Sequence, residues 1–287
     1  MKILITGGRG ALGKRVASAL ICRQRPIVLV SRRQSSSCGE AETLVGDLAD
    51  AAFVQRAIFG VTHIIHCAGE KNDPYLMETG NVLATQNLVD AATQQGVRRF
   101  IHVSSVGVIG RSTQQFIDED DDCRPMNRYE ETKLKAERIL LSSTLDGAIL
   151  RPTNIFDEQN LAPWLTMSML KLCLRAREAS HLVYMDDVVA AILFLLKSDD
   201  VGVSTYIMSS DDEAGSSVED VVRLLTGRKP MIRAPIWVPY LTRLVRDRQT
   251  NLGNKVYSAS KLFSAGFKRP YGLKNGLQRS RFEYNQY

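Results

Sequence analysis

The sequence predicts an α/β protein built on a doubly wound parallel sheet, and two observations predict this fold class. An apolar run at residues 3–5 leads into the glycine-rich segment 6–13, which is followed by a helical pattern of apolar residues. Beyond it, apolar runs alternate with helical stretches through the first half of the chain. Strands that alternate with helices in this way form parallel sheets covered by helices on both faces.

The expected elements follow one another through residue 155. Strands are predicted at residues 3–5, 27–30, 43–45, 61–66, 100–104 and 148–150. Helices are predicted around residues 16–20 and over residues 51–58, 81–95 and 129–145. The acidic stretch 118–122, which is followed by Arg124 and Pro125, is predicted to be a solvated loop. Residues 1–155 are therefore expected to form the first domain.

The alternation becomes irregular after residue 155, which predicts a second, smaller lobe. A helix is expected over residues 163–177 and a strand over residues 182–185. A further helix is expected over residues 188–196, with Asp186 or Asp187 as its N-cap. Residues 156–287 should thus form a C-terminal lobe that shapes a substrate cleft, while residues 182–210 return to the first domain.

The glycine-rich segment predicts a dinucleotide-binding site. Gly7 permits a tight turn after the first strand, Gly10 lets a pyrophosphate approach the backbone, and Gly13 allows close packing of helix and strand. Such a turn directs backbone N–H groups and a helix N-terminus toward a phosphate. An ordinary β–α turn is the alternative, but the position of the segment directly after the first strand favours the site and a Rossmann-like fold.

Composition and charge exclude several classes of protein. The net charge of +6 comes without a basic stripe interleaved with aromatic residues, which argues against nucleic-acid binding. The five cysteines include no CxxC pair, so we expect reduced thiols and no metal site. The longest apolar run, residues 188–196, is too short to span a bilayer, and a first strand starting at Lys2 leaves no room for a signal peptide. These features predict a cytoplasmic protein without membrane insertion.

The segment Tyr129-Glu-Glu-Thr-Lys133 indicates acid–base chemistry. A spacing of four residues places the phenol and the ammonium on one face of a helix. A nearby cation favours tyrosinate and should lower the pKa of the Tyr129 phenol, so that it can exchange a proton with an alcohol or carbonyl oxygen. The alternative is a surface pair on an amphipathic helix. Ser104 and Ser105 weaken that alternative, because they end a predicted strand at the sheet edge where ligands bind.

Taken in order, these motifs resemble the extended short-chain dehydrogenases/reductases of the NAD-dependent epimerase/dehydratase family. The likeness extends over essentially the whole chain. The segments that carry it are TGGRGALG at 6–13, GDL at 46–48, HCAG at 66–69, Asn81 with QNL at 86–88, SS at 104–105 with Gly110, YEETK at 129–133 with AE at 136–137, RPTN at 151–154, VYMDDV at 183–188, and SK at 260–261 with GFKRP at 266–270.

The resemblance implies a role for each matching residue. Tyr129 is the general acid/base, Lys133 binds the cofactor ribose and tunes Tyr129, and Ser105 assists. Ser105 is preferred to Ser104 because it lies five residues before Gly110, as the catalytic hydroxyl of the family does. The implied cofactor-binding residues are Gly7, Arg9, Gly10, Leu12, Gly13, Ser31, Arg32, Arg33, Asp47, Leu48 (the last two beside the adenine), Ala68, Gly69 (both beside the nicotinamide ribose), Tyr129, Lys133, Pro152 and Thr153.

The substrate set implied by the resemblance is smaller. Asn154 matches an asparagine that touches the substrate phosphates in nucleotide-sugar enzymes, and it joins Ser105 and Tyr129 in this set. Ile109 stands where the family often has Tyr, and residues 156–158 replace the usual Tyr-Gly-Pro, so substrate identity is put in doubt more than chemistry. Residues 106–107 are Val-Gly where dehydratases of the family carry Asp-Glu, which disfavours elimination of water.

Three further predictions concern a histidine, a group of arginines and the assembly of the protein. His66 is interpreted as a packing residue and not as a metal ligand. Arg243, Arg246 and Arg248 are candidates for binding a diphosphate, with a solvated surface as the alternative. The resemblance also implies a homodimer formed through residues 81–95 and 129–145.

The second predicted strand ends in Ser31, Arg32 and Arg33, without the acidic residue that accepts from an NAD ribose. Together with Arg9 these cations suit a 2′-phosphate, which predicts a preference for NADP(H) over NAD(H). A preference for NADPH favours net reduction, so the first interpretation is an oxidoreductase, a 4-ketoreductase of a nucleotide-linked sugar in polysaccharide biosynthesis. A nucleotide-sugar 4-epimerase, a reductase of another small carbonyl compound and a non-catalytic NADP-sensing protein remain as alternatives.

Overall fold

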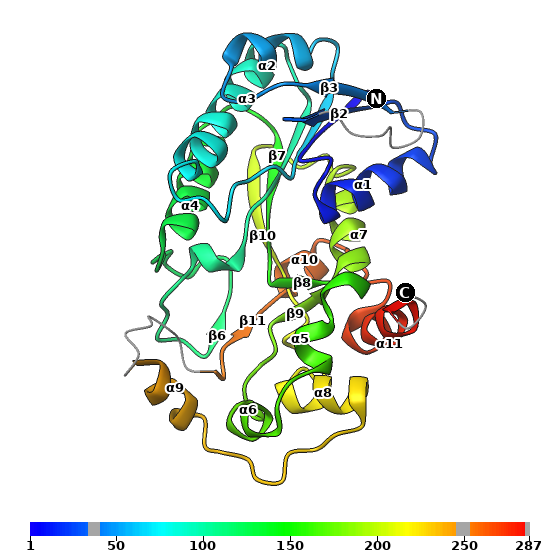
Figure 1. Cartoon of the computed structure of the whole chain (residues 1–287). Helices are drawn as coiled ribbons and strands as arrows, with labels where there is room; N and C mark the ends of the chain where they lie inside the picture. The colour runs from blue at the N-terminus through cyan, green and yellow to red at the C-terminus, as the bar shows by residue number, and fades with distance from the viewer. Residues whose placement is uncertain (34–40, 245–252, 285–287) are drawn as a thin grey trace. The chain divides into compact units, whose positions relative to one another are not determined.

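The computed structural model describes residues 1–33, 41–244 and 253–284 (Figure 1). The chain divides into two compact units. Unit 1 comprises Met1–Val108, Asn127–Arg151 and Ala191–Tyr206, and unit 2 comprises Ile109–Met126, Pro152–Ala190 and Ile207–Tyr287. No helix in the described part of the chain is long and apolar enough to cross a bilayer.

A seven-stranded sheet forms the centre of unit 1, as the predicted fold class requires. In spatial order its strands are β10 (Val203–Met208), β7 (Gly147–Pro152), β5 (Arg99–Val103), β4 (His63–His66), β1 (Ile3–Thr6), β2 (Ile27–Ser31) and β3 (Glu42–Val45). The neighbouring pairs from β7 to β3 all run parallel. Their carboxyl ends therefore meet at one edge, which receives the motifs that follow β1, β4 and β5.

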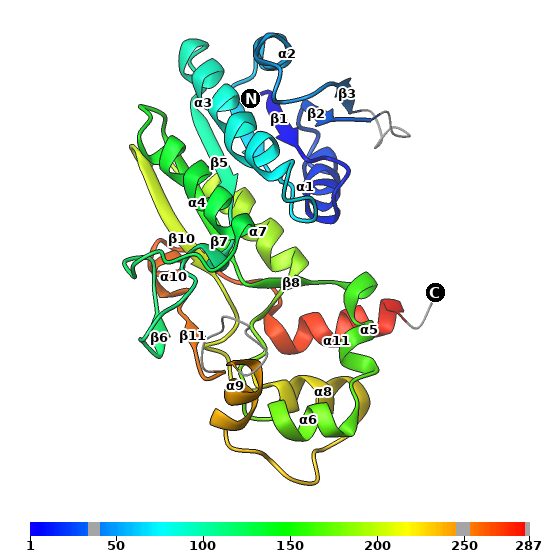
Figure 2. The same ribbon diagram turned by 60° about the vertical axis from the view of Figure 1, so that its left-hand side comes forward.

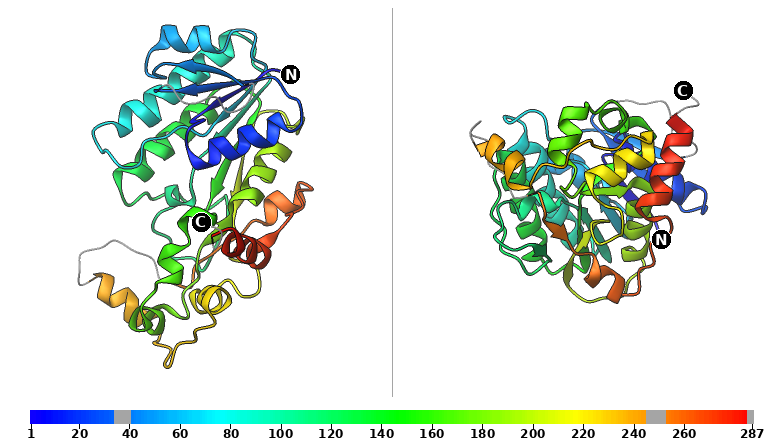
Figure 3. Two further views of the ribbon diagram at one scale, coloured as in Figure 1. Left: turned by 45° about the vertical axis from the view of Figure 1, so that its right-hand side comes forward. Right: turned by 90° about the horizontal axis from the view of Figure 1, so that it is seen from below.

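Helices cover the sheet on both faces. The helices α2 (Ala51–Ala57), α3 (Ala84–Gln94) and α4 (Arg128–Leu141) lie on one face, and α1 (Ala11–Ile21) lies on the other (Figures 1 and 2; Figure 3, left). A π-helical segment, η1 (Glu78–Leu83), runs directly into α3. Asp50 caps α2 by accepting from the N–H groups of Ala52 and Phe53, and Asn127 caps α4 in the same way.

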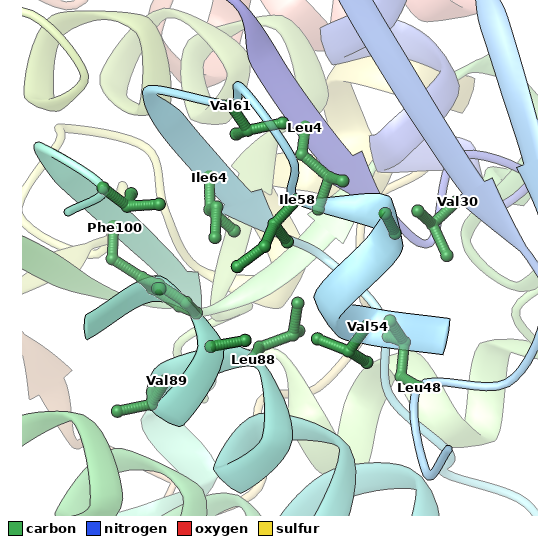
Figure 4. Packing of buried hydrophobic residues seen from close by; sticks show 14 of the residues in the cluster. Leu4, Val30, Leu48, Val54, Ile58, Val61, Ile64, Leu88, Val89 and Phe100 are labelled. Carbon is green, nitrogen blue, oxygen red and sulfur yellow. The ribbon is translucent and has the colours of Figure 1, made fainter. Parts of the chain in front are cut away.

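The core of unit 1 lies between the sheet and the helices α2 and α3. Figure 4 shows Leu4 and Ile64 from the sheet beside Val54, Ile58 and Leu88. All five side chains are essentially fully buried. Burying a Leu or Ile side chain stabilises a fold by about 1.5–3 kcal/mol. This core fixes the strands whose ends carry the site.

Among its described residues unit 2 contains two small parallel sheets, and six α-helices lie entirely within it. The sheets pair β8 (Asn154–Phe156) with β9 (Leu182–Tyr184) and β6 (Phe116–Ile117) with β11 (Val256–Tyr257). The helices are α5 (Ala162–Leu165), α6 (Met169–Arg175), α8 (Val218–Thr226), α9 (Trp237–Leu244), α10 (Ser260–Ser264) and α11 (Gly272–Tyr284). Tyr184 lies at the centre of the unit, and a Cβ on Gly276 would lie only 2.6 Å from its ring, so α11 packs closely there.

Two sequence predictions for this half of the chain are corrected. The helix expected over residues 163–177 is broken into α5 and α6, because Ser168 is extended and caps α6. The next helix, α7 (Met185–Leu195), starts three residues earlier than predicted. Asp187 consequently lies in its first turn and accepts from the N–H groups of Tyr271 and Gly272. It therefore holds the start of α11 and does not cap its own helix.

Candidate active site

The glycine turn between β1 and α1 is shaped by two close approaches. Gly7 has a φ of 69°, and a Cβ on it would lie 2.7 Å from the backbone nitrogen of Ala68. A Cβ on Gly13 would overlap the carbonyl oxygen of Gly7. Gly10 is the N-cap of α1 and offers no side chain to the N–H groups of the first turn. The turn therefore fits a pyrophosphate, since backbone donors and a helix N-terminus stay clear of side chains.

The ends of β1 and β4 are joined by His66, which is completely buried. Its Nδ1 lies 2.6 Å from Thr6 Oγ1, and its Nε2 lies 3.0 Å from Thr85 Oγ1. The Ala68 N–H donates to the same Thr6 hydroxyl. Burial lowers the pKa of His66 to about 3, and the Lys133 charge adds to this effect. His66 is thus a neutral packing residue, as the sequence predicts.

Lys133 brings the ends of β4 and β5 together. It projects from α4, is 3 % exposed, and donates from Nζ to the carbonyl oxygen of Val103 at 2.7 Å. Its Nζ also lies 3.4 Å from His102 Nε2. A Cβ on Gly69 would be 4.0 Å from the same Nζ. Tyr129, one turn earlier on α4, is half-buried.

The pKa values of this pair differ from the expectation. Burial lowers the pKa of Lys133 to about 8, although Glu137 and Cys67 oppose this shift. Burial also raises the pKa of Tyr129, and the Glu130 carboxylate raises it further. The prediction that the ammonium lowers the Tyr129 pKa is therefore wrong for this structure. Both burial and the neighbouring carboxylate favour the neutral phenol.

The two serines after β5 have different surroundings. Ser104 is 5 % exposed, and its hydroxyl has no hydrogen-bond partner among the described residues. Ser105 is half-buried, and its Oγ accepts from the Gly107 N–H at 3.1 Å. Ser105 is thus the serine with access to solvent. A Cβ at position 107 would lie 3.1 Å from the Glu130 side chain and 3.3 Å from Ser105 Oγ, so Gly107 avoids crowding beside Ser105.

A polar cluster connects the loop after β4 with the end of β2. Asn81 is buried, its Oδ1 accepts from the Glu70 N–H, and its Nδ2 donates to Thr132 Oγ1. The Glu70 carboxylate accepts from three successive N–H groups at residues 71–73 and pairs with Arg32 at 3.4 Å. The hydrogen bond from Asn72 contributes most to lowering the Glu70 pKa. The site therefore carries a fixed carboxylate next to Arg32.

The other cofactor residues predicted in unit 1 differ in their exposure and in their hydrogen bonds. Arg9 and Arg33 are exposed, and Leu12 is half-buried. The Ser31 hydroxyl donates to the Arg33 carbonyl, and Asp47 accepts from the Ala49 N–H. Leu48 packs in the core. The expected place of Asp47 and Leu48 beside an adenine stays a prediction.

The predicted residues in unit 2 lie in two places. Pro152 ends β7, Thr153 has a buried hydroxyl without a partner among the described residues, and Asn154 is exposed at the start of β8. Arg243 pairs with the buried Glu178, so its charge is already matched within the fold. Arg246 and Arg248 lie outside the described residues.

The architecture and these motifs agree with a comparison against known families. The sequence profile of the NAD dependent epimerase/dehydratase family matches residues 3–208. This chain belongs to that family. The match covers the whole sheet and every predicted catalytic residue. Enzymes of the family use NAD or NADP.

Two proteins similar to this epimerase/dehydratase family member match over most of their length at low identity. An Escherichia coli O157:H7 protein named N-acetyl-alpha-D-glucosaminyl-diphospho-ditrans,octacis-undecaprenol 4-epimerase is 26% identical, with 97% of this chain and 93% of that protein covered. Among solved structures, WbmG from Bordetella bronchiseptica in complex with NAD superposes with a TM-score of 0.79 at 21% identity, covering 100% of this chain and 94% of that one.

A third similar protein was solved with both a sugar nucleotide and a cofactor. MoeE5 in complex with UDP-glucuronic acid and NAD has a TM-score of 0.77 at 24% identity, with 100% of this chain and 99% of that chain covered. At this level of identity the likeness to solved structures establishes the fold. The chemistry of this chain must be argued from its own residues.

Sequence reasoning did not find Glu70 as a functional residue. It directly follows the HCAG segment, and its only signal in the sequence was a carboxylate within a loop. His102 was also missed, because an inward-facing histidine cannot be distinguished from other buried strand residues by pattern alone. Both become visible only when the strand ends are brought together.

Proposed function

We propose that the protein is an epimerase that inverts a hydroxyl-bearing carbon, C4, of a sugar carried on a diphosphate. The observation that carries the proposal is that Lys133 Nζ reaches the carbonyl of Val103 at the end of β5, the strand that Ser105 follows, while Tyr129 lies one turn earlier on α4 and the glycine turn follows β1 at the same carboxyl edge. A relative named as a 4-epimerase matches over nearly the whole chain, as do two relatives named as dTDP-D-glucose 4,6-dehydratases. Inversion through a transient ketone needs one acid/base and one recycled cofactor, and this residue set supplies the former.

Each side chain has a distinct task in this reaction. The bound nicotinamide supplies hydride chemistry at the sugar carbon. Tyr129 Oη takes the proton of the sugar hydroxyl and returns it to the same oxygen as the ketone is converted to the hydroxyl of opposite configuration. Lys133 stabilises the phenolate, whose formation burial opposes. Ser105 Oγ donates a hydrogen bond to the reacting oxygen and holds it in place.

The cofactor proposal rests on the cations at the end of β2. Arg32, Arg33 and Arg9 support the predicted preference for NADP(H). The Glu70 carboxylate beside Arg32 opposes that preference, because it repels a 2′-phosphate and can accept from a ribose hydroxyl. We therefore expect both cofactors to bind, with a modest advantage for NADP(H).

Two carriers fit the substrate diphosphate. One is a nucleotide, as in the sugar nucleotide bound to MoeE5, and the other is a polyprenol, as in the name of the full-length relative. Asn154 is proposed to contact the phosphates in either case, since it is exposed at the start of β8.

A 4-ketoreductase is the second candidate, as the sequence first suggested. The three arginines favour it because NADPH is consumed in a net reduction. The Arg32–Glu70 pair weakens this argument, since one of the three cations is already matched. Elimination of water is less well supported than either reaction, because Val106 and Gly107 offer no acid or base.

Assembly and location also remain proposals. The exposed sides of α3 and α4 form a shallow groove lined by Val89, Asp90, Arg138 and Ile139, among others. We propose that this face forms a homodimer and that the enzyme works in the cytoplasm. Equilibrium sedimentation of wild type against Ile139→Asp tests the dimer, and an unchanged mass would contradict the use of this face.

Product analysis tests the reaction. The enzyme with catalytic NADP⁺ or NAD⁺ is incubated with UDP-, GDP- and dTDP-hexoses and with the corresponding 4-keto sugars, while absorbance at 340 nm and NMR spectra are recorded. A new C4 isomer without net absorbance change supports epimerisation. Stoichiometric loss of NADPH with a 4-keto sugar would support the reductase instead. Cofactor binding without turnover of any sugar, polyprenyl-linked ones included, would favour a cofactor-sensing protein.

A further inference from the structure

Unit 2 exposes six large apolar side chains on two neighbouring segments. Met169 and Leu170 belong to α6, and Leu170 is 72% exposed. The remaining four lie on α9 and the loop that precedes it. They are Met231, Ile232, Trp237 and Leu241, which are 85%, 74%, 58% and 46% exposed. We call these six residues the apolar end surface.

The two segments are held side by side. The Ala234 N–H donates to the Cys173 carbonyl at 3.0 Å, which joins the loop to α6. Arg228 donates to the carbonyl oxygens of Met167 and Leu165, so the start of the same loop is fixed to the turn before α6. The ribbon shows α6, the loop and α9 next to one another in both views (Figures 1 and 2). The exposed apolar groups therefore belong to one region of unit 2.

The segments that carry the apolar end surface are rich in basic residues. Residues 162–177 and 221–244 contain no Asp or Glu. Their eight basic residues are Lys171, Arg175, Arg177, Arg223, Arg228, Lys229, Arg233 and Arg243. Four of these, Arg175, Arg223, Arg233 and Arg243, pair with carboxylates just outside the two segments. Lys171 and Lys229 are exposed and form no ion pair within the described part of the chain. The two segments that carry the apolar side chains therefore have a net positive charge, even when Glu178, Glu219 and Asp220 are counted with them.

Exposed aliphatic side chains, an exposed Trp and unmatched lysines are the combination that binds at a lipid interface. Aliphatic groups enter the boundary of the acyl chains, Trp prefers the headgroup level, and lysines attract anionic lipids. On α9, Trp237 and Leu241 are four residues apart and share one helix face. A protein partner would need acidic residues as well as an apolar face, whereas an anionic bilayer supplies both properties uniformly.

We infer that the apolar end surface docks on an anionic lipid bilayer. Docking of this kind is peripheral and needs no membrane-spanning helix. Of the two carriers proposed for the sugar diphosphate, a polyprenol lies in the bilayer and a nucleotide does not. Docking therefore favours a sugar diphosphate that is anchored in the bilayer by a polyprenyl chain. This second step rests on the proposed function, whereas the docking itself does not.

Vesicle binding tests the docking without substrate or cofactor. The full chain is mixed with vesicles of phosphatidylcholine, with or without one-third phosphatidylglycerol, and bound protein is separated by flotation. We expect binding to the anionic vesicles that weakens with added salt. In a Trp164→Phe background, Trp237 is the single Trp of the chain, and its emission should shift to the blue on binding.

Matched variants locate the surface. The double variant Met231→Ser, Ile232→Ser should bind the anionic vesicles at least ~tenfold more weakly. It removes several methylene equivalents that docking would bury in the bilayer. Lys171→Gln and Lys229→Gln should each weaken binding about fivefold. The control is Phe59→Ser, Val201→Ser, which removes side chains 79% and 90% exposed in unit 1. Circular dichroism and melting curves show that each variant is folded.

Three outcomes would overturn the docking inference. They are absence of wild-type binding to anionic vesicles, equal loss in the control variant, and a change from dimer to monomer in Met231→Ser, Ile232→Ser, which would assign the surface to a second copy of the chain.

The choice of carrier has its own test. The same sugar is offered as a UDP ester in solution and as a polyprenyl diphosphate in the anionic vesicles. Turnover of the polyprenyl form, reduced by the double variant, supports the inference. Turnover of the UDP ester alone would overturn the choice of carrier. Failure of both substrates with normal vesicle binding would count against the proposed function and leave the docking intact.

Discussion

The guanidinium of Arg32 lies 3.4 Å from the carboxylate of Glu70, so the cation at the end of β2 has an anionic neighbour from the loop after β4. Arg32 is 61% exposed and free to rearrange, whereas Glu70 is held by the N–H groups of residues 71–73. The fixed member of the pair is thus the carboxylate. A cofactor with a 2′-phosphate must share Arg32 with it.

Replacement of Glu70 should change cofactor selection. Glu70→Gln keeps an oxygen acceptor for the backbone turn but removes the charge, so Arg32 becomes available to a 2′-phosphate. We expect the ratio of NADPH to NADH affinity to rise by about ten- to a hundredfold, since one charge-assisted hydrogen bond contributes roughly 1.5–3 kcal/mol. Fluorescence titration of both cofactors measures the ratio. Arg32→Ala is the matched control and should lower it; an unchanged ratio in both variants would exclude the pair from cofactor selection.

The sequence predicts six strands of the seven-stranded sheet, but neither β10 nor this pair. The strands β1, β2, β4, β5 and β7 were found because buried parallel strands are short apolar runs next to recognisable helices. Tyr129, Lys133 and Ser105 were found through fixed spacings within single segments. Glu70 and Arg32 are 38 residues apart, and no local spacing joins them. Their contact is set by the order of β2, β1 and β4 in the sheet.

Other errors have the same origin. Asp186 or Asp187 is predicted to cap the helix that follows, because capping is a local rule, but Asp187 does not do so. Its real partners, Tyr271 and Gly272, lie more than 80 residues away. The Tyr129 pKa was expected to fall because the spacing showed a nearby cation, while burial and its own neighbour Glu130 act in the opposite direction. The spacing of two residues along a helix shows that their side chains are close to one another. It does not show whether burial removes water from them.

Lys133 should give the folded state a specific pH dependence. Its pKa is about 8 in the fold and 10.5 in a solvated chain, so between these values the unfolded state binds more protons. Stability therefore rises with pH in this window, because the fold is relieved of a buried charge as Lys133 deprotonates. Urea unfolding of wild type and Lys133→Met between pH 7 and 10.5 measures this. The difference in unfolding free energy should move in favour of wild type as pH rises, and a constant difference would show that Lys133 titrates normally.

The phenol of Tyr129 should be needed for turnover and not for cofactor binding. Tyr129→Phe removes only the hydroxyl, and a positioned acid/base contributes about 10²–10⁴-fold to the rate. We expect kcat to fall by that factor while the affinity for NADPH and NADH changes little. Steady-state kinetics and cofactor titration on the same preparation separate the two effects. A loss of only a few fold would remove Tyr129 from the acid/base role.

The two serines after β5 provide an internal comparison. Ser105→Ala should lower kcat, because it removes the half-buried hydroxyl that is proposed to hold the reacting oxygen, and a factor of ~10²–10³ is typical for one such donor. Ser104→Ala should leave kcat within a few fold, since the Ser104 hydroxyl is buried and has no partner among the described residues. If Ser104→Ala were the slower enzyme, the assignment of the two serines would have to be exchanged.

Gly7 and Gly60 distinguish a strained backbone from a crowded one. Both have a positive φ, 69° and 71°, but a Cβ would meet the backbone of Ala68 only at Gly7, while nothing lies within 4 Å at Gly60. Gly60→Ala should therefore cost only the left-handed conformation, about 1–2 kcal/mol. Gly7→Ala adds the displacement of the β4 end, roughly another 1–3 kcal/mol of overpacking. Urea unfolding gives both values, and cofactor titration should show weaker binding for Gly7→Ala alone, because only that variant moves the turn against the loop at Ala68. Equal losses of stability in the two variants would mean that the close approach at Ala68 can relax without cost.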